Sequence, residues 1–166
     1  PAFASIPVSS FFLTLLIIAM PIRPAAANNV IQIEAEDLDL TSYEIENHAF
    51  TSNGKVISLL GPSGSTGSGS GRFTGDEGDY TIVINYLDEE DGEGLLAFEA
   101  NGVTIENWTL DQRLGANQPE PNALTARTFG PVHLKRGDVF NILANKSGDE
   151  SVSVDLIQFI PVTDIY

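Results

Sequence analysis

The feature that most constrains this chain is a succession of short runs rich in β-branched and aromatic residues, separated by turn residues. Residues 30–36 alternate apolar and polar side chains, which is the period of a half-buried strand. Helical periodicity is almost absent. Seven further runs are predicted as strands: 55–60, 78–86, 95–100, 103–110, 125–134, 138–144 and 151–160. Eight or nine strands at regular spacing indicate an all-β protein, a β-sandwich or jelly roll.

Turn residues predict how these strands connect. Asn101-Gly102 indicates a hairpin, because both residues tolerate positive φ. We also expect the runs 78–86 and 95–100 to pair as a hairpin across the acidic turn Asp88–Glu93. The Gly/Ser-rich stretch 61–71 is predicted as a flexible loop. An interdomain linker is the alternative, but too little chain precedes it to form a separate domain.

The first residues have the pattern of a targeting segment. Residues 11–20 form a continuous apolar run, followed by the small residues Ala25-Ala26-Ala27. We predict a signal peptide over residues 1–27, itself N-terminally truncated because no Met or basic residue precedes the run. A membrane anchor is the alternative, since 3–22 is nearly long enough to span a bilayer. We therefore expect a secreted, extracellular or periplasmic protein with one module over 28–161 and a short tail over 162–166.

Charge and cysteine content exclude several kinds of function. The 166 residues include 23 acidic and 8 basic side chains, for a formal net charge of −15. Such a surface repels phosphate backbones and anionic lipids, so we expect no nucleic-acid partner and no membrane contact after signal cleavage. The chain has no cysteine and therefore no disulfide. A bound metal ion is one alternative way to staple a small extracellular domain.

No catalytic constellation is visible. The two histidines, His48 and His133, have no serine elbow beside them, and the Gly-rich stretch lacks the Gly-Lys-Ser/Thr ending of a phosphate-binding loop. Acidic residues are plentiful, but no pair stands out as a glycosidase couple. We predict a non-catalytic protein; a lyase or hydrolase is the weaker alternative.

Three acidic residues near the two ends of the predicted module indicate a cation site. Glu34 and Glu36 occupy alternate positions, so we expect both to face the same side of the first strand. Asp155 stands among apolar residues of the last strand, and a buried Asp needs a partner or a metal. If the two strands are neighbours, these carboxylates converge and Ca²⁺ suits them. A solvated edge strand with exposed acids is the alternative.

Five short motifs in this order resemble the carbohydrate-binding modules of families 6 and 35, which are galactose-binding-like β-sandwiches attached to secreted glycanases and lyases. The motifs lie at residues 33–36, 78–86, 101–103, 134–138 and 154–157. Segments 56–59, 86–92 and 108–112 also resemble a cyanobacterial and marine-bacterial variant found in large secreted proteins. The resemblance covers residues 30–161.

The resemblance implies a structural calcium ion and a sugar site. The ion would be held by Glu34, Glu36 and Asp155 together with backbone oxygens near Gly54 and Lys55. In family 6, glycans commonly bind in a cleft at the loop end. The residues that could bind the sugar here are Asn145 and the rings of Tyr43, Phe50 and Trp108, although Trp108 alternates with Leu110 and also suits a core position.

The acidic turn Asp88–Glu93 has two interpretations, a second cation site or a solvated turn, and we expect the solvated turn.

We expect the whole chain to be a non-catalytic, calcium-stabilised module that binds a polysaccharide or oligosaccharide. It could belong to a larger secreted protein with other domains. The alternative is a structural or adhesive calcium-binding module that contacts protein partners.

Overall fold

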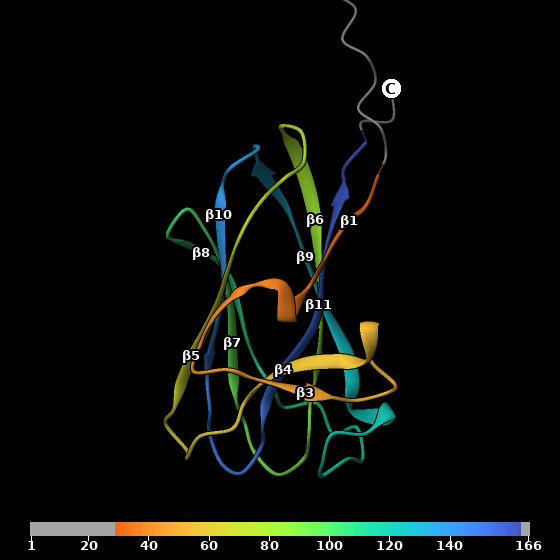
Figure 1. Ribbon diagram of the computed structural model, residues 1–166, viewed down its shortest axis with the longest axis vertical. Coiled ribbons are helices and arrows are strands. Elements are labelled where there is room, and N and C mark those ends of the chain that lie inside the picture. The colour runs from red at the N-terminus through yellow and green to blue at the C-terminus, as the bar shows by residue number, and fades with distance from the viewer. Residues whose placement is uncertain (1–28, 164–166) are drawn as a thin grey trace, which may run out of the picture.

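The computed structural model describes residues 29–163, and in this range it is a sandwich of two antiparallel sheets (Figure 1). The predicted all-β sandwich is therefore confirmed. Three one-turn 3-10 helices interrupt the strands: η1 (Ala35–Asp37), η2 (Ser52–Gly54) and η3 (Pro121–Ala123). The eleven strands are β1 (Ile31–Glu34), β2 (Asp39–Thr41), β3 (Glu44–Asn47), β4 (Lys55–Leu59), β5 (Thr66–Arg72), β6 (Gly78–Leu87), β7 (Leu95–Ala100), β8 (Val103–Thr109), β9 (Leu124–Leu134), β10 (Val139–Asn145) and β11 (Val152–Pro161).

One sheet has the order β3-β4-β11-β6-β9, with β1 also paired to β11, and the other has the order β2-β5-β10-β7-β8. The strand count exceeds the expected eight or nine because β2, β3 and β5 were not predicted. Strands β2 and β3 have only three and four residues and carry several acids. Strand β11 is central to its sheet, and it lies beside β1, so the two ends of the module meet.

Aromatic rings from both sheets fill the core between them. The rings of Phe98 and Phe140 stack at 5.9 Å, and Phe159 from the opposite sheet meets Phe140 edge-on at 5.2 Å. All three side chains are fully buried. Burial of a Phe side chain contributes about 1.5–3 kcal/mol, so this cluster is a main source of stability.

The Gly/Ser stretch is not a flexible loop, so that prediction is wrong. Most of it forms β5, in which serines and glycines alternate with period 2. The glycines are there because core side chains cross directly over the strand. A Cβ at Gly71 would lie 2.4 Å from the Phe140 ring, and one at Gly69 would lie 2.9 Å from Leu38. Composition alone resembles a linker, whereas the alternation is that of a strand with no room for side chains on its inner face.

The connection from β6 to β7 is also not a hairpin. Strand β6 pairs with β9 and β11, while β7 pairs with β8 and β10, so the acidic turn carries the chain from one sheet to the other. The Asn101-Gly102 hairpin between β7 and β8 is confirmed, with φ of 51° and 79° at the two residues. The loops that follow β6, β8 and β10 gather at one end of the sandwich, opposite the end where β1 begins and β11 finishes (Figure 1).

The predicted signal peptide lies outside the described residues. Within residues 29–163, no helix is long and apolar enough to cross a membrane.

Candidate functional site

Strand β11 changes partner at Asp155, and this leaves a gap along its edge. It pairs with β4 as far as Val154 and with β1 from Leu156 onward. Its register against β6 also shifts at this point, so Asp155 occupies a bulge. Two one-turn helices lie at the gap: η1 continues from the end of β1, and η2 leads into β4.

The predicted acids do meet at this gap, but Glu36 arrives there by a different route. Strand β1 ends at Glu34, and Glu36 belongs to η1. The expectation that both acids share one face of a strand is therefore wrong. The chain turns because Ala35 is packed into the core, where the small side chain lets η1 lie against β4 and β11.

The η2 turn joins all three carboxylates. The Ser52 main-chain N–H donates to Asp155 Oδ1 at 2.9 Å, and the Ser52 hydroxyl donates to Glu34 Oε1 at 2.9 Å. The Asn53 side-chain amide donates to Glu36 Oε1 at 2.9 Å. Sequence reasoning missed Ser52 and Asn53. The signal was the Ser-Asn-Gly turn before β4, where Asn53 and Gly54 have φ of 50° and 71°.

Each glutamate of this site keeps one carboxylate oxygen without a partner. Glu34 Oε2 and Glu36 Oε2 are buried and accept no hydrogen bond. Burial raises the pKa of Asp155 to about 6, the Ser52 N–H opposes the rise, and the charges of Glu34 and Glu36 add to it. Carboxylates that repel one another and keep buried oxygens without a partner are suited to a hard cation.

The predicted backbone ligands already have hydrogen bonds within the loop. The Gly54 carbonyl accepts the His48 N–H at 3.0 Å, and the Lys55 carbonyl accepts the Thr51 hydroxyl at 3.0 Å. Each carbonyl has a second lone pair. Within residues 29–163, no three His, Cys, Asp or Glu side chains are arranged to hold an ion by themselves. An ion at this gap therefore needs hydroxyl or main-chain oxygens as additional ligands.

Two of the predicted sugar-stacking rings belong to the core, so those predictions are wrong. Trp108 is 6% exposed and packs on Tyr86 at 5.7 Å and on Phe129 at 6.4 Å. Tyr43 is also buried, and its burial raises the pKa of its phenol. Trp108 faces inward because it lies on the same side of its strand as the buried Leu110. Phe50 is half-buried, beside His48 and a small satellite cluster.

Asn145 is exposed at the end of β10, as a sugar ligand must be. It lines a shallow hollow on the outer face of the five-stranded sheet. A second amide and several aliphatic side chains line the same hollow: Asn107, Leu95, Ala97 and Leu143.

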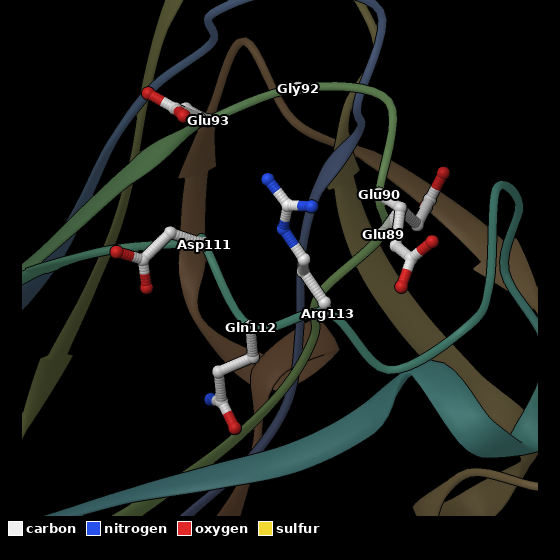
Figure 2. A pocket seen from close by; sticks show the side chains of 7 residues that line it. All are labelled: Glu89, Glu90, Gly92, Glu93, Asp111, Gln112 and Arg113. Atoms are coloured by element: carbon white, nitrogen blue, oxygen red, sulfur yellow. The ribbon is translucent and has the colours of Figure 1, made fainter.

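A different, strongly polar pocket lies at the loop end. Its lining comes from the turn after β6 and the loop after β8: Glu89, Glu90, Gly92, Glu93, Asp111, Gln112 and Arg113 (Figure 2). The pocket has a volume of about 210 Å³. Figure 2 shows the Arg113 side chain extending between the two walls. Among the described residues, Arg113 forms no ion pair, so its guanidinium is available to a ligand.

Buried carboxylates lie next to this loop-end pocket, so the expected solvated turn is wrong for its first residues. Asp88 and Glu150 are fully buried, and Glu89 is 4% exposed. Burial raises the pKa of Asp88 to about 6 and the pKa values of Glu89 and Glu150 to about 7, with neighbouring acids contributing. Only Glu90, Asp91 and Glu93 are exposed as expected. The turn is buried because it crosses between sheets and docks on the loop before β11.

Solved structures with this architecture include carbohydrate-binding modules. A family 35 module from Clostridium thermocellum aligns with 81% of this chain and 99% of its own, with a TM-score of 0.63 and 14% identity. A family 6 module of a marine laminarinase from Zobellia galactanivorans aligns with 80% of this chain and 99% of its own, with a TM-score of 0.56 and 19% identity. The chain has the fold of family 6 and family 35 carbohydrate-binding modules.

The predicted resemblance to these modules is thereby confirmed at the level of the fold. A mannanase of Podospora anserina that carries a family 35 module gives a TM-score of 0.65 at 15% identity, over 84% of this chain and 29% of that one. No protein-family model matches the sequence. An α-glucuronidase of Hypocrea jecorina is 26% identical over 139 residues, which are 81% of this chain and 16% of the enzyme. The chain therefore spans about a sixth of the length of this relative.

Proposed function

We propose that this chain is a non-catalytic, calcium-stabilised carbohydrate-binding module of a secreted protein, and that it binds a polysaccharide or oligosaccharide at the loop-end pocket. The observation that carries the proposal is this polar pocket at the loop end of a sandwich whose structural neighbours are such modules. Carboxylates accept hydrogen bonds from sugar hydroxyls, while Gln112 and Arg113 donate them.

The size and charge of the pocket favour a neutral sugar unit at a chain end or branch. Its volume of about 210 Å³ is below the roughly 300–1,000 Å³ of pockets that enclose a drug-sized ligand. Four lining carboxylates surround a single guanidinium, so an anionic sugar meets repulsion. The α-glucuronidase relative makes a glucuronic-acid glycan the natural comparison, with Arg113 as the group that would pair with its carboxylate.

The calcium ion would be held by Glu34, Glu36 and Asp155, with Ser52 and main-chain oxygens near Gly54 and Lys55 completing its shell. The free buried oxygens of the two glutamates support this assignment. The ion would join β1, β4 and β11 at the gap beside Asp155. In a chain without cysteine, such an ion would provide a stabilising cross-link of the kind that a disulfide provides in other small domains.

Affinity electrophoresis tests the carbohydrate proposal. Gels containing laminarin, galactomannan or glucuronoxylan would be run with Ca²⁺ for the wild type, Asp111→Asn and Asn145→Ala. We expect a neutral glycan to retard the wild type and Asn145→Ala but not Asp111→Asn. Loss of retardation in Asn145→Ala alone would move the site to the hollow on the five-stranded sheet. No retardation of a folded, calcium-loaded wild type by any of the three glycans would contradict the proposal.

A second candidate function is an adhesive module that contacts protein partners. It is motivated by the loop-end pocket, whose lining lacks the aromatic ring on which sugars commonly stack. Capture of an envelope or matrix protein that persists after glycan digestion would favour this reading. Product release from the same glycans tests the non-catalytic assignment, and we expect none.

A further inference from the structure

The turn that forms one wall of the loop-end pocket is held by a residue outside the pocket. Glu150, in the loop before β11, points its carboxylate at both ends of this turn. Its Oε1 accepts the Glu89 main-chain N–H at 2.8 Å, and its Oε2 accepts the Gly94 main-chain N–H at 3.1 Å. Two oxygens of one fully buried side chain therefore set the distance between the first and last residues of the 89–94 turn.

The two loops are also fitted to each other around this carboxylate. Gly92 and Gly148 form an isolated antiparallel bridge, and a Cβ at Gly92 would lie 2.4 Å from the Ser147 carbonyl oxygen and 2.5 Å from Glu150 Cβ. The buried Lys146 ammonium donates to the Asp149 and Glu150 carbonyl oxygens at 2.7 and 2.6 Å. Lys146 thus fixes the Glu150 backbone, while the Glu150 carboxylate is left to hold the turn.

We propose that Glu150 is a positioning residue for carbohydrate binding: its carboxylate fixes the 89–94 turn, and protonation of Glu150 loosens that wall of the pocket. The inference rests on the proposed function, because it concerns the same pocket. An ionised carboxylate accepts a hydrogen bond at each oxygen. In a protonated carboxyl group, one of the two oxygens becomes a hydroxyl and only the carbonyl oxygen remains a good acceptor. The main-chain N–H of Glu89 or of Gly94 then loses its partner inside a buried site.

The charges around Glu150 place this change near neutral pH. The acids that face Glu150 are Asp88, Glu89 and Asp91 from the turn after β6. Glu46 of β3 acts on Glu89 in the same direction, and the Lys146 ammonium acts on Glu89 in the opposite direction. Among the described residues, Glu89 Oε1 is buried and has no hydrogen-bond partner. Burial, together with the negative charges, raises the pKa of Glu150 to about 7, and the two N–H bonds oppose the rise.

The test combines affinity electrophoresis at pH 5.5 and pH 8 with an NMR titration of the Glu89 and Gly94 amides, all with Ca²⁺ present. The gels contain laminarin, galactomannan or glucuronoxylan, and the variants are Glu150→Gln and, as a charge-matched control, Glu44→Gln at an exposed position of β3. In the wild type, we expect retardation to weaken at least about threefold from pH 8 to pH 5.5 as one N–H bond is lost. Both amides should titrate together, with one midpoint near neutral pH.

Glu150→Gln has one acceptor oxygen at any pH, so it should bind at both pH values as the wild type does at pH 5.5. Glu44→Gln should behave as the wild type. Wild-type retardation at pH 8 by a folded Glu150→Gln overturns the inference. The inference is also overturned if the Glu89 and Gly94 amides of the wild type do not titrate together. This second outcome does not depend on whether a variant folds. If no glycan retards the wild type at either pH, the proposed function fails and this inference with it.

Discussion

Ser52 donates its main-chain N–H to Asp155 across 2.9 Å, which joins residues 103 positions apart in the sequence. The same serine donates its hydroxyl to Glu34, so one residue of a short turn contacts acids from both ends of the module. Because of this relationship, an ion bound at the gap beside Asp155 would connect both ends of the module.

Removal of Ca²⁺ is expected to lower the melting temperature by several degrees. Saturating ion stabilises the folded state by a few kcal/mol when it binds that state alone, and about 1 kcal/mol corresponds to about 2–8 °C in domains of this size range. Calorimetry with Ca²⁺ and with chelator measures the difference. Asp155→Asn should abolish the difference, whereas Glu44→Gln should retain it. Equal melting of the wild type in both buffers would show that no stabilising ion binds.

Stability in chelator is expected to fall as the pH rises from about 4 to 7. A carboxyl whose pKa is higher in the folded than in the unfolded state binds more protons when folded, so its ionisation destabilises the fold as pH passes through that window. Asp88 and the Glu89–Glu150 pair have such raised pKa values, about 6 and about 7. Melting curves of the wild type, Glu89→Gln and Glu44→Gln measure this. The dependence of melting temperature on pH should become weaker in Glu89→Gln but not in Glu44→Gln. If all three proteins show the same dependence, general charge repulsion and not Glu89 is its cause.

Gly71→Ala is expected to destabilise the sandwich by about 1–3 kcal/mol through overpacking. The new methyl group would lie 2.4 Å from the Phe140 ring, which other core rings prevent from moving. Urea denaturation gives the free energy of unfolding. Ser70→Ala, on the outer face of the same strand, is the matched control and should change it by less than about 0.5 kcal/mol. A neutral Gly71→Ala would mean that β5 has room on its inner face.

Trp108→Ala is expected to lower stability by about 3–5 kcal/mol, as removal of a core ring does. A sugar-stacking tryptophan would instead lose binding with little change in stability. Urea denaturation and affinity electrophoresis on the same variant separate the two roles. Asn145→Ala, at an exposed position, should leave the unfolding curve unchanged. If Trp108→Ala has wild-type stability, the core role is wrong and Trp108 becomes a candidate for sugar stacking again.

The sequence predicted the features that depend on local pattern. Strands with β-branched alternation, such as β6 and β11, were found within a residue or two, and so was the Asn101-Gly102 hairpin. The meeting of Glu34 with Asp155 followed from the assumption that the end strands are neighbours. It was correct because β1 and β11 do pair.

Features that depend on tertiary packing could not be read from the pattern. Strand β5 carries no apolar side chain, since its inner face is filled by side chains from elsewhere, and composition therefore suggested a loop. The role of Ser52 depends on a turn that meets β11 across the sheet. In the sequence, Glu150 resembles any acid of a surface loop. It is buried, and it holds the Glu89 and Gly94 N–H groups, only because two loops pack against each other.

The antiparallel pairing of Ile31 with Phe159 has a consequence for architecture. Strand β11 is ten residues long, so it carries the chain about 33 Å from the loop-end pocket to the end where β1 starts. Any polypeptide joined to either end therefore attaches to the pole of the sandwich remote from the pocket. In a larger protein the loop-end pocket would therefore face away from the other domains, where it stays accessible to a large ligand.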